Sequence, residues 1–251
     1  MNARRRGRLL LLPAAVLAAG LVWCGAELPV LGTDRHPYGA RSVAAALRQH
    51  TSNAVSSINF DQRALDTLGE ESILFAAVLG AVVLLRQVRG ERRHTPRAGY
   101  VLPSTRLFGV GLLPVALLTG VYVVAHGAVT PGGGFQGGVV LASGLHVAYV
   151  AADYRVLRRL RPLVVLESAE AVAAGSFAGL GLAGLACCAA YLKNVLPLGA
   201  FGQLASGGLV GVLNAAVGVA VASGVVVLLA GFLEQAVELD DAGEETTEGE
   251  G

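Results

Sequence analysis

The chain has 251 residues, of which 54% are hydrophobic and 15% charged, and its mean hydropathy is +0.61. Soluble domains carry roughly a quarter charged residues, so this composition indicates an integral membrane protein. The net charge of +1 does not bear on nucleic-acid binding, and no combined basic and aromatic pattern suggests it. The three cysteines form no CxxC pair, so we expect no metal site, no disulfide framework and no cofactor.

The N-terminal part combines one apolar run with a polar insert. Met1–Arg8 is basic, and an apolar run follows from Leu9 to about Ala26. This order is typical of a signal peptide, but a run of about 18 residues can also span a bilayer as a retained first helix, which is the interpretation that we favour. Residues 27–70 are polar. Within them the sequence predicts a helix at Arg41–Gln49 and, from weak alternation, an extended segment at Ala54–Phe60.

Five further apolar runs follow, and most are close to the roughly 20 residues that a membrane helix needs. They cover Ser72–Val88, Leu107–Ala125, Gly138–Ala152, Leu163–Leu192 and Gly207–Leu233. The third of these is short unless it includes part of the glycine-rich stretch before it. With the N-terminal run, they predict an all-α integral membrane bundle of about six transmembrane helices.

Basic residues are distributed unevenly between the connecting segments. If the N-terminus is cytoplasmic, fourteen of the nineteen Lys and Arg residues fall on the cytoplasmic side. The positive-inside rule therefore predicts both termini in the cytoplasm, with residues 27–70 and the glycine-rich stretch on the opposite side. The fourteen are Arg4, Arg5, Arg6, Arg8, Arg86, Arg89, Arg92, Arg93, Arg97, Arg106, Arg155, Arg158, Arg159 and Arg161.

The glycine-rich stretch consists of Pro131, Gly132, Gly133, Gly134, Phe135, Gln136, Gly137 and Gly138. Each glycine costs about 1 kcal/mol relative to alanine inside a helix, so we expect this stretch to interrupt the helices and to pack against protein or water. Its Gly-x-Gly-x-x-Gly spacing formally matches a dinucleotide fingerprint, but it follows a membrane span instead of a short strand, which argues against nucleotide binding. The spacings Gly175–Gly179 and Gly207–Gly211 predict further close helix packing.

Two acidic residues, Asp66 and Glu70, stand at the beginning of the second span and are four residues apart. On a helix they would share one face. Carboxylates at a membrane edge are costly and tend to be functional, and two that lie close together suit a proton or sodium site. The alternative is a solvated cluster at a helix N-terminus, which acidic residues favour for electrostatic reasons.

Three more ionisable residues lie within later spans. Glu167 and Glu170 are three residues apart near the start of the Leu163–Leu192 run, and His146 lies in the middle of Gly138–Ala152. Each is a candidate for ion translocation, because ionisable residues at such depths usually face a bundle interior or water. The alternatives are ion pairs between the two acids and Arg158–Arg161, and an interhelical hydrogen bond of His146.

Two stretches resemble subunits of known ion-transporting complexes. Residues 103–235, with the Pro131–Gly138 motif and the Leu213–Val219 segment, resemble the B subunit of Mrp/Mnh-type multi-subunit sodium/proton antiporters. That family commonly has a Gly-His pair before the motif, whereas this chain has His126 before Gly127. Asn53–Leu85 is similar to the C-terminal module of the antiporter A subunit, which is a separate E subunit in membrane-bound hydrogenases.

The second resemblance rests on an Arg-x-x-Asp-Thr-x-Gly-Glu pattern, matched here by Arg63, Asp66, Thr67, Gly69 and Glu70. It implies a role of Asp66 and Glu70 in ion transport. The two resemblances together imply a fusion of a two-helix module at residues 1–90 with a four-helix module at residues 106–235. A basic linker at residues 91–105 would join them, and residues 236–251 would form an acidic, disordered tail.

The resemblances imply a membrane subunit of a multi-subunit cation/proton antiporter that contributes to a sodium/proton path and to assembly, and is itself not an enzyme. Its partners would be the other membrane subunits, both large antiporter-like and small helical ones, together with the bilayer of the cell membrane, sodium ions and protons. One alternative is a membrane-arm subunit of an ion-pumping hydrogenase or a related complex-I-like oxidoreductase. The other is a purely structural role in assembly.

Overall fold

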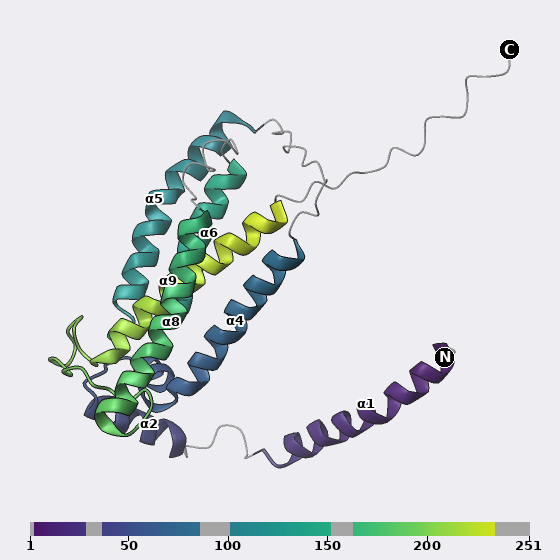
Figure 1. Ribbon diagram of the computed structural model, residues 1–251, viewed down its shortest axis with the longest axis horizontal. Coiled ribbons are helices and arrows are strands. Elements are labelled where there is room, and N and C mark those ends of the chain that lie inside the picture. The colour runs from purple at the N-terminus through teal and green to yellow at the C-terminus, as the bar shows by residue number, and fades with distance from the viewer. Residues whose placement is uncertain (1–2, 29–36, 86–100, 152–162, 234–251) are drawn as a thin grey trace. The chain divides into compact units, whose positions relative to one another are not determined.

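The computed structural model describes residues 3–28, 37–85, 101–151 and 163–233. Among these residues every regular element is helical, so the predicted all-α fold is confirmed (Figure 1). The elements are α1 (Ala3–Ala26), α2 (Pro37–Arg48), α3 (Ala54–Ser57), η1 (Ile58–Gln62), α4 (Ala64–Leu84), α5 (Pro103–Ala125), α6 (Gly134–Ala151), α8 (Leu163–Cys188) and α9 (Leu209–Leu233).

The helices that can cross a membrane number five among the described residues: α4, α5, α6, α8 and α9. The apolar part of α1, Pro13–Ala26, is shorter than the other spans. The expected six spans are therefore five full-length helices and one shorter apolar helix. The chain divides into two compact units, one of residues 1–40, which contains α1, and one of residues 41–251, which contains the five spans.

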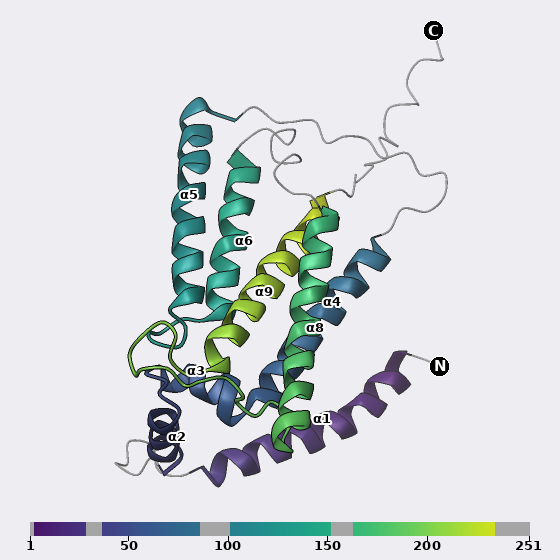
Figure 2. The same cartoon turned by 60° about the vertical axis from the view of Figure 1, so that its left-hand side comes forward.

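Helix α9 is the centre of the second unit. The α5 and α6 pair packs on one side of it, and α4 and α8 pack on the other, as both views show (Figures 1 and 2). Its residues Leu209, Val210, Leu213 and Val217 are fully buried and form the middle of the hydrophobic core. Residues from every other part of the unit therefore meet along one helix.

Consecutive spans run in opposite directions, so α4 and α6 end where α5 and α8 begin (Figure 2). The described helix ends that border the two basic sequence segments consequently lie at one end of the bundle. At the other end, the segment from α2 to η1 meets the turn after α5 and the loop between α8 and α9. His50 Nδ1 lies 2.7 Å from the Gly199 carbonyl oxygen there. The orientation derived from the positive-inside rule, with both termini in the cytoplasm, stays a prediction.

The glycine-rich stretch is only partly irregular, because α6 begins inside it at Gly134. Gly132 and Gly133 have φ angles of +136° and +135°, values that favour glycine. The expectation that the stretch interrupts the helices is therefore wrong for Gly134 and Gly137, and the short predicted span from Gly138 does include part of the stretch. The close packing described below explains why these glycines stand in a helix despite their low helix propensity.

Two boundaries in the polar insert also differ from the sequence prediction. Ala54–Phe60 is not extended, since α3 and the π-helical η1 cover it; Asn53 begins this turn by accepting hydrogen bonds from the amides of Val55 and Ser56. Helix α4 begins at Ala64, eight residues before the predicted span, so Asp66 and Glu70 lie within the helix.

The fifth predicted run ends early. Helix α8 stops at Cys188, because Ala189 and Leu192 both adopt a φ angle of 58°, which no helix continues. The linker predicted at 91–105 falls largely outside the described residues, and the tail at 236–251 falls entirely outside them. Residues from 41 onward form one compact unit, and the division into modules of different origin stays a prediction.

Candidate functional site

A buried asparagine on α9 holds the glycine-rich stretch in place. The Asn214 side chain is fully buried, and its Oδ1 accepts a hydrogen bond from the Gly134 amide at 2.9 Å. Its Nδ2 donates to Ser56 Oγ at 2.8 Å and to the Val210 carbonyl at 2.9 Å. One side chain thus joins α9, the start of α6 and α3, which are far apart in the sequence.

A second asparagine fixes the turn that precedes the glycines. Asn53 Nδ2 donates to the carbonyl oxygens of Gly127 at 2.8 Å and Thr130 at 2.9 Å, while its Oδ1 caps α3. The backbone N–H of Asn53 also donates a hydrogen bond to the Ala128 carbonyl oxygen at 3.1 Å. The backbone of this turn, which could not be satisfied by lipid, is therefore paired with protein.

The glycines of α6 allow its backbone to approach two other helices. A Cβ atom at Gly134 would lie 2.5 Å from the Asn214 carbonyl oxygen on α9, and one at Gly138 would lie 2.9 Å from the Gly218 carbonyl oxygen. On the opposite side, a Cβ atom at Gly137 would lie 2.8 Å from the Gly120 carbonyl oxygen on α5. The motif is thus a device for close helix packing.

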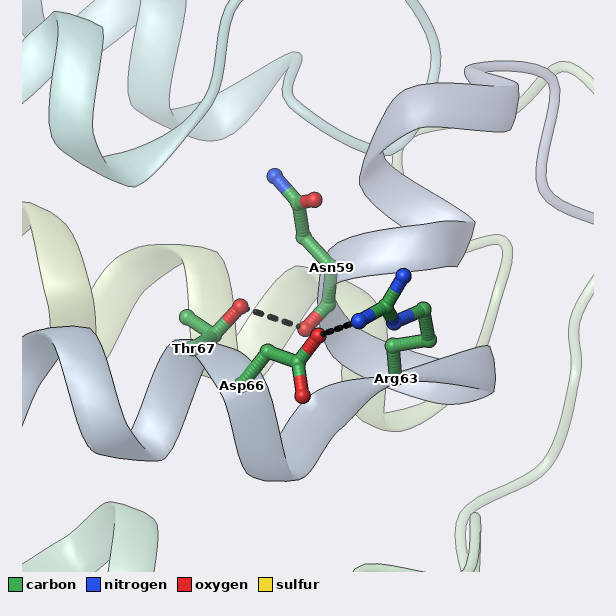
Figure 3. A network of polar contacts seen from close by, with 4 residues as sticks. All are labelled: Asn59, Arg63, Asp66 and Thr67. Atoms are coloured by element: carbon green, nitrogen blue, oxygen red, sulfur yellow. Dashed lines mark hydrogen bonds and ion pairs between the residues drawn. The ribbon is translucent and has the colours of Figure 1, made fainter. Parts of the chain in front are cut away.

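The predicted acids Asp66 and Glu70 lie on the outer surface of α4. Asp66 forms an ion pair of 2.5 Å with Arg63, and both side chains are more than half exposed (Figure 3). Close to this pair, Thr67 Oγ1 donates to the Asn59 carbonyl at 2.7 Å and ties α4 to η1. Glu70 is exposed one turn further along the helix. Both acids therefore point away from the core of this chain, and their role in ion transport stays a prediction.

The neighbouring residue Glu71, which sequence reasoning did not single out, points inward. Its side chain is 2% exposed, and neither carboxyl oxygen has a hydrogen-bond partner among the described residues. It shares the buried line of α4 with Ala64, Thr67 and Val78. Because α4 is apolar nearly all round, no periodicity in the sequence indicates which side of the helix is buried.

The acids of α8 are separated in the same way. Glu167 is exposed, whereas Glu170 is 4% exposed, and its Oε1 has no hydrogen-bond partner in the described part of the chain. His146, the other candidate, is half-buried on α6, a helix that packs against α5 and α9. The structure thus associates Glu170 with the α4, α8 and α9 side of the bundle and His146 with the other side.

Burial without a partner makes the charged form of a carboxylate unfavourable. The effective penalty for moving an ion into a protein interior is several kcal/mol, which exceeds what one ordinary hydrogen bond contributes. An apolar residue in the place of Glu71 or Glu170 would avoid this penalty. Among the described residues, Glu71 and Glu170 are consequently two acids whose burial packing does not explain.

Residues 104–227 match the protein family described as a domain related to the MnhB subunit of Na+/H+ antiporter. The chain is also 31% identical over 199 residues to the uncharacterized protein MJ1307 of Methanocaldococcus jannaschii, and that match covers 68% of this chain and 73% of the relative.

Two solved structures of membrane complexes contain similar chains. One is the structure of the membrane-bound sulfane sulfur reductase, an archaeal respiratory membrane complex, with a TM-score of 0.69, 26% identity, and coverage of 92% of this chain and 99% of that chain. The other is the Mrp complex from Dietzia sp. DQ12-45-1b, with a TM-score of 0.67, 25% identity, and coverage of 96% of this chain but 27% of that chain. This chain therefore belongs to the family of MnhB-related multi-pass membrane proteins.

Proposed function

We propose that this chain is a membrane subunit of a multi-subunit cation/proton antiporter, in which it contributes to the sodium/proton path and to assembly. The MnhB-related domain and the similarity to a chain of the Mrp complex support this proposal. The additional N-terminal spans would correspond to the A-subunit module, whose acidic pattern is present at Asp66 and Glu70.

The observation that carries the proposal is the exposure of Asp66 and Glu70 on a helix that can cross a membrane. A carboxylate that faces the bilayer interior costs up to about 3 kcal/mol on insertion scales. These side chains are therefore expected to face water or another subunit. An acidic surface at a boundary between subunits is suited to binding and releasing a cation.

Asp66→Asn and Glu70→Gln test this role in membrane vesicles that contain the whole complex. Each change removes a charge and keeps the shape of the side chain, so we expect the sodium-dependent pH change to fall while assembly remains normal. Ser72→Ala is the matched control, because Ser72 is exposed on the same helix and donates only locally to the Leu68 carbonyl.

Normal transport by both charge-neutral variants, in complexes assembled to the normal amount, would refute the ion-handling role. A lower yield of complex with unchanged transport per complex would instead indicate a structural role. The two readings are thus separated by measuring transport and complex yield in the same vesicles.

The second candidate function is a subunit of the membrane arm of an ion-pumping oxidoreductase. It is favoured by the match to the sulfane sulfur reductase complex, which covers nearly the whole of both chains. Purification of the native complex distinguishes the two functions, since co-purifying iron–sulfur subunits would support the oxidoreductase, and antiporter-like subunits alone would support the antiporter. In the oxidoreductase the redox chemistry would belong to other subunits.

A further inference from the structure

The Glu170 carboxylate occupies a space that a glycine on the facing helix leaves open. A Cβ atom at Gly224 of α9 would lie 2.7 Å from Glu170 Oε1 and 3.3 Å from Val78 Cγ2 of α4. Three helices therefore meet around this carboxyl group. The group is 4% exposed, and Oε1 has no hydrogen-bond partner among the residues that the structure describes.

Glu71 places a second unpartnered carboxyl group in the same part of the bundle. It lies on the buried line of α4 that also contains Val78, the residue next to the Glu170 site. Seven residues separate Glu71 from Val78, which corresponds to about 10 Å along a helix. The Glu71 carboxyl group is therefore buried at a different level of α4 from the Glu170 site.

We propose that Glu71 and Glu170 are two proton-binding sites inside this subunit. Each carboxyl group binds a proton and releases it during transport. The statement that these protons are used in transport rests on the proposed antiport function. Proton binding by the two carboxyl groups does not depend on that function. A proton needs only one carboxylate oxygen, and the neutral acid needs far less solvation than the ion. The proposed assignment therefore matches both the burial of the two groups and their lack of partners.

The surroundings favour a proton over a sodium ion. A hard cation is held by several oxygen ligands, and in the described residues no three His, Cys, Asp or Glu side chains come together. A Cβ atom placed at Gly224 would lie close to both Glu170 Oε1 and the apolar Val78 Cγ2. Within the described ranges, no cluster of acidic, histidine or cysteine side chains thus surrounds Glu170 to hold a cation.

The other charged groups on the packed helices stand on outer surfaces. Helix α9 has no titratable residue between Leu209 and Leu233. Asp66 and Glu70 of α4 and Glu167 of α8 are exposed. Glu71 and Glu170, the inner acids, would therefore bind and release protons inside the bundle. Asp66 and Glu70, the outer acids of α4, would bind the cation at the surface of the bundle.

Infrared difference spectroscopy of the whole complex tests proton binding directly. At neutral pH we expect the carbonyl stretching band of a protonated carboxylic acid, with a shift in heavy water. Part of the band should disappear in Glu71→Gln and part in Glu170→Gln, whereas Glu167→Gln, which changes an exposed acid of α8, should leave it unchanged. Glu170→Asp should retain a band.

A band that is absent in the wild type, or unchanged when both inner acids are replaced, would overturn the proposal. A band that disappears when sodium is added at constant pH would show a cation site and would also overturn it. If Glu71→Gln reduces the yield, Glu71→Met serves instead, because an apolar side chain of similar size leaves no polar group unpaired.

Transport measured in the same preparations tests whether the protons are used. We expect Glu170→Gln to lose antiport with normal assembly, and unchanged antiport would overturn this part of the proposal. The spectroscopic result is independent of the transport result for Asp66→Asn and Glu70→Gln. The part of the carboxylic acid band that is assigned here comes from Glu71 and Glu170, not from Asp66 or Glu70. Failure of the outer-acid variants to change transport would therefore leave the spectroscopic result standing.

Discussion

Replacement of Asn214 by alanine should destabilise the bundle more than any single exposed substitution. The change removes three hydrogen bonds, and it leaves the Gly134 amide and the Ser56 hydroxyl without the partner that Asn214 supplied. Each abandoned buried group costs about 1–3 kcal/mol. The expected loss for the two groups is therefore about 4 kcal/mol, before the cavity left by the missing amide is counted.

The assay is thermal unfolding of the purified complex in detergent, with Val212→Ala as the control. Val212 lies on the same helix but is 43% exposed, so its truncation should change the free energy of unfolding by about 0.5 kcal/mol. A loss of 4 kcal/mol corresponds to a decrease in Tm of about 10 °C for a chain of this size. If Asn214→Ala and Val212→Ala unfold at the same temperature, the hydrogen bonds of Asn214 do not hold the glycine-rich stretch.

Three other predictions concern packing and charge. Gly134→Ala should lower Tm, because the new Cβ would lie 2.5 Å from a backbone oxygen. Gly175→Ala, whose Cβ would have nothing within 4 Å, should raise the stability of this chain by up to about 1 kcal/mol. A lower Tm for Gly175→Ala than for Gly134→Ala would contradict the packing described above. Phe177→Ala should cost about 3–5 kcal/mol by denaturant titration, because Phe177 is fully buried against Phe60, and Leu182→Ala, which is exposed on α8, is its control. Burial raises the pKa of Asp61 above its ordinary value of 3.8. Between pH 3.8 and the raised pKa, the native state therefore binds more protons than the unfolded state, and the free energy of unfolding falls as the pH rises. Asp61→Asn should accordingly gain stability over the parent protein at neutral pH and lose this advantage below pH 3.8, and parallel pH profiles of the two proteins would disprove it.

The apolar runs were sufficient to predict which segments form spans, because a helix that crosses a bilayer needs a continuous apolar stretch of fixed length. Their ends were predicted less well. Helix α4 begins at Ala64 because its first turns pack on η1 and α9, a tertiary contact that no local pattern contains. Likewise, α6 includes Gly134–Gly138 because close approach to α5 and α9 outweighs the low helix propensity of glycine.

The inner and outer acids illustrate a different limit of sequence reasoning. The four-residue spacing of Asp66 and Glu70 correctly predicts that they share one side of α4. It does not reveal that this side is exposed and that Glu71, one residue further, is buried. In a soluble helix the polar side would identify the exposed surface, whereas a membrane helix is apolar toward both lipid and protein. For the same reason, the sequence prediction of close helix packing at Gly175–Gly179 fails within this chain, where a Cβ atom at either glycine would have nothing within 4 Å.

The central position of α9 has a consequence for how the protein is made. This helix leaves the ribosome after α4, α5, α6 and α8, yet Asn214 and the core residues around it contact α3, α4, α6 and α8. Until it is inserted, α4, α6 and α8 lack the helix on which they pack, and Glu170 has no third helix to enclose it. The native arrangement therefore forms only after α9 has been made, and truncation within α9 should leave α4, α8 and the α5 and α6 pair inserted but not assembled with one another, as substrates for membrane quality control.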